Sequence, residues 1–306
     1  MNVQTTMDAT LPQGFTAGHW TDPTALTGCT VILCPEHTVA ACDIRGNSPG
    51  SRELPLLDSI RTMPEIHALL LTGGSAFGLA AADGVMRFLE EHGIGYMTPW
   101  ARVPIVPGAV IYDLNVGSAT VRPTAEAGYA ACSAAVPAIA SGHVGVGTGA
   151  MVGKWQGLER AMRGGLGVAA DRIGATTLVA IAAVNAVGDV YETDGSVLAG
   201  ARGTQERWAS TEFHGRFQLP LDPAPVNTTL VALVSDAKLS KVDAHRMSQR
   251  AHDGMARAVR PVHTSHDGDV VFTLASGIHD CPFDVIAEAG AELTAAAIRN
   301  AVRVPV

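Results

Sequence analysis

The sequence of 306 residues contains few charged and few aromatic side chains, at 16% and 5% of the chain. The formal net charge is -8, and Lys and Arg do not cluster on any one segment. This charge distribution lacks the basic surface that binds nucleic acid independently of base sequence. We therefore expect no nucleic-acid partner, and a ligand that is small or neutral.

Membrane-spanning runs and paired cysteines are also missing. The longest uncharged stretch, Ala127–Gly153, is broken by Pro137, His143 and several glycines, and Ile173–Gly188 is shorter than the roughly 20 apolar residues of a span. The five cysteines include no CxxC pair, which is typical of a reducing compartment. The N-terminal segment has no apolar core of a secretory signal. We expect a cytoplasmic protein without a membrane span.

Glycine is abundant instead, with 33 residues, and favours close packing of one backbone segment on another. Apolar runs predict strands at 66–72, 103–112, 176–187, 230–234 and 270–274, and hairpins formed by 30–33 with 38–43 and by 190–193 with 197–199. Helical spacing predicts helices at 75–93, capped by Ser75, and at 125–136, 240–259 and 287–302. This irregular order of strands and helices favours an α+β layered fold.

A polar, proline-containing segment at residues 203–225 lacks both periodicities and is predicted to be an exposed linker. It ends at Asn227-Thr228-Thr229, where an apolar strand begins. If the chain is cut before Thr228, the new α-amine has a reference pKa of about 8 and can act as general base for its own hydroxyl. That hydroxyl could make the cut by attacking the preceding carbonyl. The alternative is a plain turn from loop to strand.

Three polar residues in apolar surroundings are further candidates. Lys154 follows the glycine-rich loop Gly142–Gly153 and is either a solvated surface residue or a group that stabilises an oxyanion or a proton network. Asn185 interrupts an apolar strand, where an unpaired amide costs roughly 1–3 kcal/mol, so a partner must satisfy it. Tyr112 ends a short apolar run and is either a core residue or an oxyanion donor.

The turn His263–Asp269 carries two imidazoles and two carboxylates directly before a strand. It lacks both HExxH spacing on a helix and the length of a calcium loop, so we expect no metal. Asp267 and Asp269 are candidates for orienting a nucleophile, and a plain polar turn is the alternative. Residues 149–155 and 71–78 contain glycines but fail the spacing rules of phosphate and dinucleotide loops. We expect no cofactor.

Six blocks in one order resemble the L-aminopeptidase/D-esterase family, also called DmpA-like peptidases, which includes the nylon-oligomer endohydrolases. The resemblance extends over nearly the whole chain, from about residue 28 to residue 299. The blocks are Leu71–Gly78, Val110–Asp113, Gly149–Lys154, Val184–Gly188, Asn227–Thr229 and His263–Asp269.

The resemblance implies a four-layer αββα sandwich like that of other N-terminal-nucleophile hydrolases. It also implies one domain, residues 1–306, that cleaves itself into a large subunit, 1–227, and a small subunit, 228–306. Thr228 matches the nucleophile. The residues that would surround it, as in the Thr-type nylon-oligomer branch, are Lys154, Asn185, Tyr112, Asp267 and Asp269.

The aminopeptidase branch differs from this chain at the same positions. There the nucleophile is a serine after glycine, and the downstream turn carries Ser and Glu. This chain has Asn227 before Thr228 and an aspartate at both turn positions. The predicted activity is therefore hydrolysis of amide or peptide bonds in a small substrate, by an aminopeptidase or an oligo-amide hydrolase. The resemblance implies a homo-oligomer, namely a tetramer.

Three alternatives stay open from the sequence. An ornithine-acetyltransferase-like enzyme would use the same self-liberated threonine but would pass the acyl group to an amine. An unprocessed scaffold of the same fold would bind without catalysis. A nucleotide-binding protein is disfavoured, because the glycine-rich segments fail the spacing rules.

Overall fold

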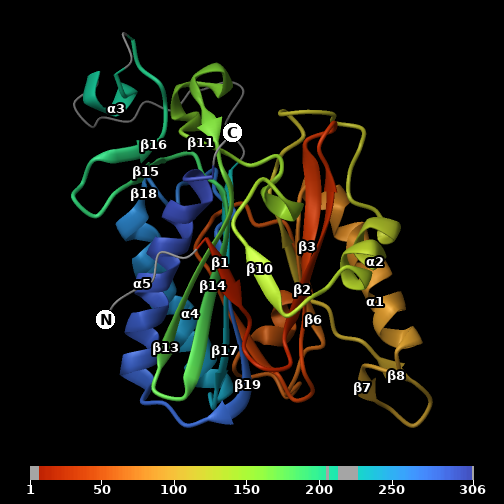
Figure 1. Ribbon diagram of the computed structural model, residues 1–306. Coiled ribbons are helices and arrows are strands. Elements are labelled where there is room, and N and C mark those ends of the chain that lie inside the picture. Colours follow the sequence, from red (N-terminus) through yellow and green to blue (C-terminus); the bar gives the residue numbers. More distant parts are fainter. Residues whose placement is uncertain (1–6, 205–206, 213–226, 305–306) are drawn as a thin grey trace.

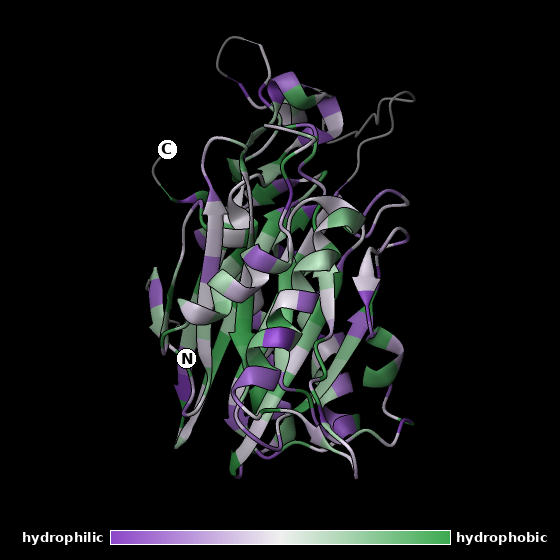
Figure 2. Cartoon of the chain, turned by 90° about the vertical axis from the view of Figure 1, so that its right-hand side faces the viewer, coloured by the Kyte–Doolittle hydropathy of each residue, from purple (hydrophilic) through white to green (hydrophobic). Residues whose placement is uncertain are grey.

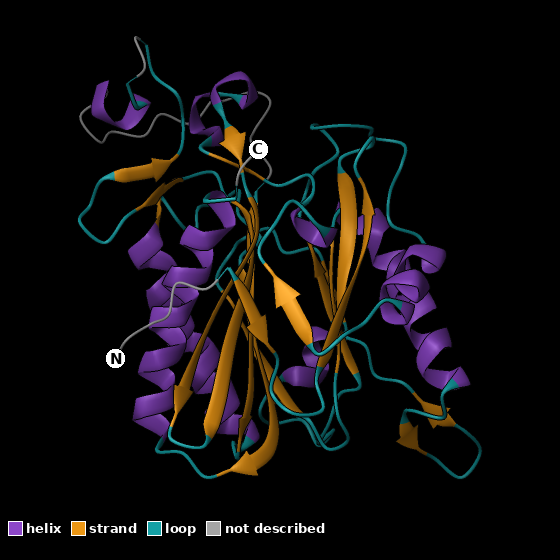
Figure 3. Cartoon of the chain, in the orientation of Figure 1, coloured by secondary structure: helices purple, strands orange, loops and turns teal. Residues whose placement is uncertain are grey.

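The computed structural model describes residues 7–204, 207–212 and 227–304. Two β-sheets lie face to face, and helices cover the outer side of each, so that four layers follow one another in the order α, β, β, α (Figures 1 and 3). The predicted four-layer α+β sandwich is confirmed. None of the helices in the described ranges combines the length and apolar character that a membrane crossing requires.

The first sheet, which we call the long sheet, contains the strands that lead to the acidic turn and to Thr228. Its neighbours are antiparallel except β17 and β19, which run parallel. Helices α4 (Lys241–Ala258) and α5 (Phe283–Val302) pack on its outer face. The strand order is β13 (Gly165–Ile173), β14 (Thr176–Asn185), β17 (Thr228–Ala237), β19 (Val270–His279) and β4 (Val39–Ile44).

The second sheet, which we call the short sheet, is built largely from the N-terminal third of the chain. Only β6 and β9 are parallel neighbours in it. Helices α1 (Ala81–Glu91) and α2 (Ala125–Ser133) cover its outer face, on the right of Figure 1. The strand order is β2 (Thr16–Asp22), β3 (Thr27–Leu33), β6 (Ala68–Thr72), β9 (Gly108–Val110) and β5 (Ser51–Arg52).

Alternation along β17 assigns its side chains to two different cores. Leu230, Ala232 and Val234 enter the core between the sheets, whereas Val231 and Leu233 face α4 and α5. Successive side chains of a strand point to opposite faces, so a central strand covered on both sides is apolar throughout. Figure 2 shows this as hydrophobic strands enclosed by helices with hydrophilic outer residues.

Smaller elements complete the fold. The predicted hairpin around Asp194–Gly195 is confirmed, because β15 pairs with β16. The remaining strands and α-helix of the described residues are β15 (Asp189–Tyr191), β16 (Val197–Ala199), β18 (Val259–Arg260), β1 (Asp8–Thr10), β10 (Ala138–Ala140), β7 (Tyr96–Met97), β8 (Arg102–Val103), β11 (Met151–Val152), β12 (Met162–Arg163) and α3 (Ala209–Glu212).

Three local predictions are wrong. The strand predicted at 103–112 is instead two short strands, β8 and β9, in different sheets, because Pro104 and Pro107 lack the N–H that a sheet ladder needs. The strands predicted at 30–33 and 38–43 exist as β3 and β4, but they belong to different sheets and do not pair. Separation lets Ile32 and Ala40 enter the core between the sheets from opposite sides, which a flat hairpin would not allow. Ser75 does not cap a helix by its side chain: it starts a 3₁₀ helix with a φ of 53°, and α1 begins only at Ala81.

Strand β13 was not predicted, because Gly165 and Gly167 weaken its strand pattern. The glycines have a packing function. A Cβ at Gly167 would lie 1.9 Å from the carbonyl oxygen of Ala297 in α5, so the helix rests directly on the strand backbone. The predicted linker at 203–225 lies largely outside the described residues. Within it, Ala209 of α3 is buried against Trp155.

We predict that Gly167→Ala lowers the free energy of unfolding by about 1–3 kcal/mol, because a methyl group there collides with backbone that cannot rotate away. Urea denaturation followed by circular dichroism measures the change. Gly142→Ala is the matched control, since its Cβ would meet only the side chain of Val144 at 3.5 Å. Equal stability of the two variants would contradict direct contact between α5 and β13.

Candidate active site

Thr228 is the first residue of β17 and is buried, as is Asn227 before it. By the alternation of β17, its side chain belongs to the face between the two sheets. The backbone of Asn227 is joined to the turn before β19: its N–H donates to the carbonyl of His266 at 3.2 Å, and its carbonyl accepts from the N–H of Gly268 at 2.9 Å. The predicted acidic turn therefore lies directly beside the Asn227–Thr228 bond.

The carbonyl oxygen of Asn227 receives two donors. One is the N–H of Gly268, and the other is the Thr228 hydroxyl, whose Oγ1 lies 2.5 Å from that oxygen. A Cβ at position 268 would lie 2.8 Å from Oγ1 of Thr228. Glycine is thus the residue that lets the turn approach the hydroxyl. Gly268 was not predicted as a site residue, since a backbone donor leaves no signature in the residue types.

Asn185 ends β14 directly opposite Thr228 in the antiparallel register. Its Oδ1 accepts from the N–H of Met151 at 3.0 Å and from Nζ of Lys154 at 2.9 Å, and its Nδ2 donates to the carbonyl of Tyr112 at 2.9 Å. The side-chain amide of Asn185, predicted to need a partner, thus has three hydrogen-bond partners. One Nδ2 hydrogen remains for a further acceptor, because an amide nitrogen carries two.

Lys154 is buried, so its interpretation as a solvated surface residue is wrong. Its Nζ donates to both the backbone oxygen and Oδ1 of Asn185, at 2.9 Å each. Burial lowers the pKa of Lys154 to about 7, and the nearby carboxylates of Asp267, Asp113 and Asp269 limit the fall. Near neutral pH, this lysine therefore exists in both the charged and the neutral form.

The two aspartates of the turn have different partners. Oδ2 of Asp267 accepts from the N–H and the hydroxyl of Thr264, at 2.8 and 2.7 Å. Burial, with a further contribution from Asp269, raises the pKa of Asp267 to about 6. Oδ1 of Asp269 accepts from the N–H of Thr229 at 2.6 Å, and its Oδ2 accepts from His263. Asp269 thus holds the backbone one residue beyond Thr228.

Tyr112 joins this cluster in a different way from the one predicted. The contact that the structure shows runs through its backbone carbonyl, which accepts from Nδ2 of Asn185, and not through its hydroxyl. The side chain is half-buried. The predicted tyrosine therefore lies at the site, whereas a role for its phenol as oxyanion donor stays a prediction.

Asp113 is a site residue that the sequence analysis missed, although it stands next to Tyr112. Its buried carboxylate accepts from the hydroxyl of Thr27 and from the N–H of Gly74, at 2.7 Å each. Burial raises its pKa, and the charge of Lys154 opposes that rise. A Cβ at Gly73 would lie 2.2 Å from Oδ2 of Asp113. The glycines that imitate a dinucleotide loop therefore make room for a carboxylate.

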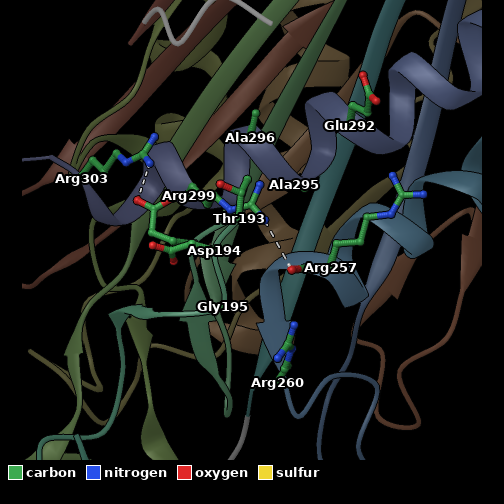
Figure 4. A pocket seen from close by; sticks show the side chains of 11 residues that line it. Thr193, Asp194, Gly195, Arg257, Arg260, Glu292, Ala295, Ala296, Arg299 and Arg303 are labelled. Carbon is green, nitrogen blue, oxygen red and sulfur yellow. Dashed lines mark hydrogen bonds and ion pairs between the residues drawn. The ribbon is translucent and has the colours of Figure 1, made fainter.

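A cavity of about 790 Å³ beside α5 and the β15–β16 hairpin shares no residue with this cluster (Figure 4). Two of the arginines that line it already have partners: Arg303 pairs with Glu192 at 2.5 Å, and Arg299 donates to the carbonyl of Arg257 at 3.4 Å. Arg260 lies over the ring of Tyr191. The cavity is thus a separate surface feature, and the buried cluster at Thr228 remains the candidate active site.

Comparison with known proteins identifies the group to which this architecture belongs. The model of peptidase family S58 matches residues 11–304. The chain belongs to this family. The resemblance to the DmpA-like peptidases is thereby confirmed, and this S58 peptidase is a hydrolase that acts on amide bonds.

Relatives of known sequence carry two kinds of name. A protein of Mycobacterium tuberculosis named as an uncharacterized aminopeptidase is 43% identical over 291 residues, which cover 86% of this chain and 80% of the relative. A 6-aminohexanoate-oligomer endohydrolase of Agromyces sp. is 32% identical over 264 residues, with coverage of 84% and 71%. The S58 peptidase described here is thus similar in sequence to members of both groups.

Solved structures show the same fold. The L-aminopeptidase D-Ala-esterase/amidase of Ochrobactrum anthropi, described as a variant of the Ntn hydrolase fold, matches with a TM-score of 0.71 and 16% identity. A β-aminopeptidase of Burkholderia sp. matches with a TM-score of 0.68 and 20% identity. Each match covers 95% of this chain and 84% of the other. The S58 peptidase therefore has the Ntn hydrolase fold.

We predict how the free energy of unfolding depends on pH for two proteins that both carry Thr228→Ala, one with Lys154 and one with Lys154→Met. The advantage of the methionine protein over the lysine protein should be greatest below pH 7. There lysine is protonated in both folded and unfolded chains, so the full cost of burying a cation is present. Between pH 7 and the unfolded pKa of 10.5, the folded chain releases its proton first, and the lysine protein gains up to about 1.4 kcal/mol per pH unit.

Urea denaturation of both proteins at pH 6 and pH 9 checks this expectation. The advantage of the methionine protein in free energy of unfolding should shrink at pH 9. The hydrogen bonds that methionine cannot make are missing at both pH values, so they do not contribute to this change. A difference that is the same at both pH values would show that Lys154 does not titrate near neutrality.

Proposed function

We propose that this S58 peptidase cleaves its own chain between Asn227 and Thr228, and that Thr228 then acts as N-terminal nucleophile on linear amide substrates. One observation carries the proposal. The Thr228 hydroxyl lies 2.5 Å from the Asn227 carbonyl oxygen, while the N–H of Gly268 donates to the same oxygen in a buried site. A nucleophile and an oxyanion donor thus converge on one peptide bond.

The first reaction is the self-cleavage. Oγ1 of Thr228 attacks the carbonyl carbon of Asn227, the C–N bond breaks, and an ester links the two residues while the nitrogen of Thr228 becomes an amine. Water then hydrolyses the ester to a carboxylate and the free hydroxyl. The N–H of Gly268 stabilises the oxyanion during attack, because it already points at that oxygen.

A proton acceptor other than the amine is needed at this stage, since the nitrogen of Thr228 is still an amide. Lys154 fits this role. Its lowered pKa of about 7 leaves a neutral fraction that can take the hydroxyl proton and return it to the departing nitrogen. Its hydrogen bonds to Asn185, which stands opposite Thr228 in the register of β14 and β17, support this assignment.

The side chain of Asn227 supports cleavage in a second way. It is buried, and neither its Oδ1 nor its Nδ2 has a hydrogen-bond partner within the part of the chain that the structure describes. A buried unpaired polar group costs roughly 1–3 kcal/mol. Release of residue 227 as a free chain end would relieve this cost, which favours the cleaved state.

The second reaction is hydrolysis of the substrate. The freed α-amine, with a reference pKa of about 8, takes the hydroxyl proton as Thr228 attacks the substrate carbonyl. The remaining Nδ2 hydrogen of Asn185 and the Tyr112 hydroxyl are the proposed oxyanion donors. The amine passes its proton to the leaving nitrogen, and water hydrolyses the acyl ester. The carboxylates of Asp113, Asp267 and Asp269 balance Lys154 and the new ammonium group.

Two features support the proposed substrate class. The relatives are named aminopeptidases at 43% identity and 6-aminohexanoate-oligomer endohydrolases at 32% identity. The Asn-Thr junction and the two aspartates follow the nylon-oligomer branch to which the sequence was compared. We therefore propose short linear amides as substrates, either peptides or oligomers of ω-amino acids.

We predict that the wild-type protein yields two fragments of roughly 23 and 8 kDa in an intact-mass spectrum, in proportion to residue number. Thr228→Ala should remain one chain, because the attacking hydroxyl is gone, whereas Thr228→Ser should still split. Thr229→Ala is the matched control: it keeps the N–H that Asp269 binds and should split like the wild type. A Thr228→Ala chain that divides at this bond would sink the proposal.

We also predict that the rate of self-cleavage depends on Lys154. Below pH 7 the neutral amine falls tenfold per pH unit, so the rate should fall in parallel, and above pH 7 it should level off. The loss of precursor after cell-free synthesis between pH 5 and 9 measures the profile. Lys154→Met should slow cleavage about 100-fold or more. An inflection near pH 6 would instead identify Asp267 as the proton acceptor.

A further inference from the structure

His263 lies one step behind the residues of the proposed mechanism. Its Nδ1 lies 2.8 Å from Oδ2 of Asp269, and its backbone N–H donates to the same oxygen at 3.1 Å. The other oxygen, Oδ1, accepts from the N–H of Thr229 at 2.6 Å. Both carboxylate oxygens are thus fixed, and a continuous path of hydrogen bonds runs from His263 to the residue that follows Thr228.

The backbone of His263 adopts a conformation that side chains other than glycine rarely take. Its φ is 56°, in the left-handed region, where Asn, Asp and His are enriched among residues with a side chain. Such a conformation costs of order 1–3 kcal/mol and persists where surrounding contacts hold it. Here the two hydrogen bonds to Asp269 accompany this backbone conformation and hold it in place.

A second histidine supports the ring of the first. His252, buried in α4, stands edge-on to His263, with ring centroids 4.7 Å apart and planes at 73°. Its Nε2 lies 3.1 Å from the carbonyl oxygen of Asp43 in β4. Burial lowers the pKa of His252 to about 4, so it is neutral at physiological pH. His263 therefore rests on an uncharged ring that α4 holds in place.

In the described part of the chain, the other ring nitrogen of His263 has no partner, so the polar contacts of the ring point to Asp269. Its Nε2 is buried and has no hydrogen-bond partner among residues 7–204, 207–212 and 227–304. The polar contacts of the side chain in those ranges are therefore with Asp269 alone. A histidine retained only for packing would not need to direct its ring nitrogen and its backbone N–H to one carboxylate oxygen.

We propose that His263 is a positioning residue: through Asp269 it fixes the N–H of Thr229 and thereby the place of the Thr228 hydroxyl against the carbonyl it attacks. The inference rests on the proposed function and adds a residue to it. Attack requires the reacting atoms within a narrow range of distance and angle, so a displacement of about 1 Å can cost about 100-fold in rate. Without the ring donor, Asp269 would be held on that oxygen by a backbone N–H only.

The test compares His263→Asn with His263→Gly. Both residues tolerate the left-handed backbone, but only Asn carries a side-chain amide donor near the position of Nδ1. We expect His263→Asn to cleave itself within about 3-fold of the wild-type rate, and His263→Gly to be about 10- to 100-fold slower. In the cleaved enzymes, kcat should fall in the glycine variant while KM stays near the wild-type value.

Chemical rescue gives a readout that a merely structural role would not move. The His263 side chain is 18% exposed, so added imidazole can reach the space left by glycine and restore the donor to Asp269. The rate of His263→Gly should then rise with imidazole concentration, whereas His263→Asn should not respond. If the glycine variant does not fold, as judged by its thermal transition, His263→Ala serves as second probe with the same rescue.

Two results would overturn the assignment. One is equal self-cleavage rates for the asparagine and glycine variants in folded protein. The other is a slow glycine or alanine variant that imidazole leaves unchanged. Either result, with wild-type protein that splits before Thr228, rejects the role of His263 alone. A Thr228→Ala protein that still splits rejects the proposed function and leaves His263 without a reaction to serve.

Discussion

The placement of Thr228 depends on the register of β17 between its two neighbours. On one side, β14 brings Asn185 directly opposite Thr228. On the other side, the turn before β19 bonds to the backbone of Asn227 and Thr229. Since side chains alternate along a strand, a slip of one residue would turn Thr228 toward the helices and remove it from the cluster. Because β17 is apolar on both faces, hydrophobicity alone does not oppose that slip, and the hydrogen bonds of Asn227 and Thr229 to the turn before β19 hold the register.

Burial at the seam between the sheets gives the site its chemistry. The same desolvation lowers the pKa of Lys154 and raises those of Asp267 and Asp113. The pKa values of the lysine and of the aspartates thereby move toward neutral pH from opposite directions. A proton can then pass between such groups at a small cost in free energy. Water-exposed residues of the same types would keep their ordinary pKa values. The two surrounding cores therefore shift the pKa values of the candidate site as well as stabilising the fold.

The sequence predicted the side chains of the site better than its backbone. Lys154, Asn185, Asp267 and Asp269 were candidates because a polar residue in an apolar strand or beside a conspicuous turn leaves a pattern. In the structure Asn185 lies opposite Thr228, Lys154 bonds to Asn185, and the turn with Asp267 and Asp269 lies beside Asn227 and Thr229. The N–H of Gly268 and the carbonyl of Tyr112 could not, since every residue type offers these groups. The pairing of β3 and β4 was mispredicted because neighbours in sequence need not share a sheet.

Several of the abundant glycines allow the close contacts that form the candidate site and its support. At Gly268 the missing side chain admits the Thr228 hydroxyl, and at Gly73 it admits the carboxylate of Asp113. At Gly167 it lets α5 lie on the backbone of β13, next to the strand that carries Asn185. A side chain at Gly73 or Gly268 would displace the buried groups of the site, whereas one at Gly167 would displace α5 from the outer face of the long sheet. Groups displaced toward water would return to the pKa values of exposed residues. The scarcity of aromatic residues is therefore consistent with a seam between two sheets that is narrow enough to keep a lysine and three aspartates out of solvent.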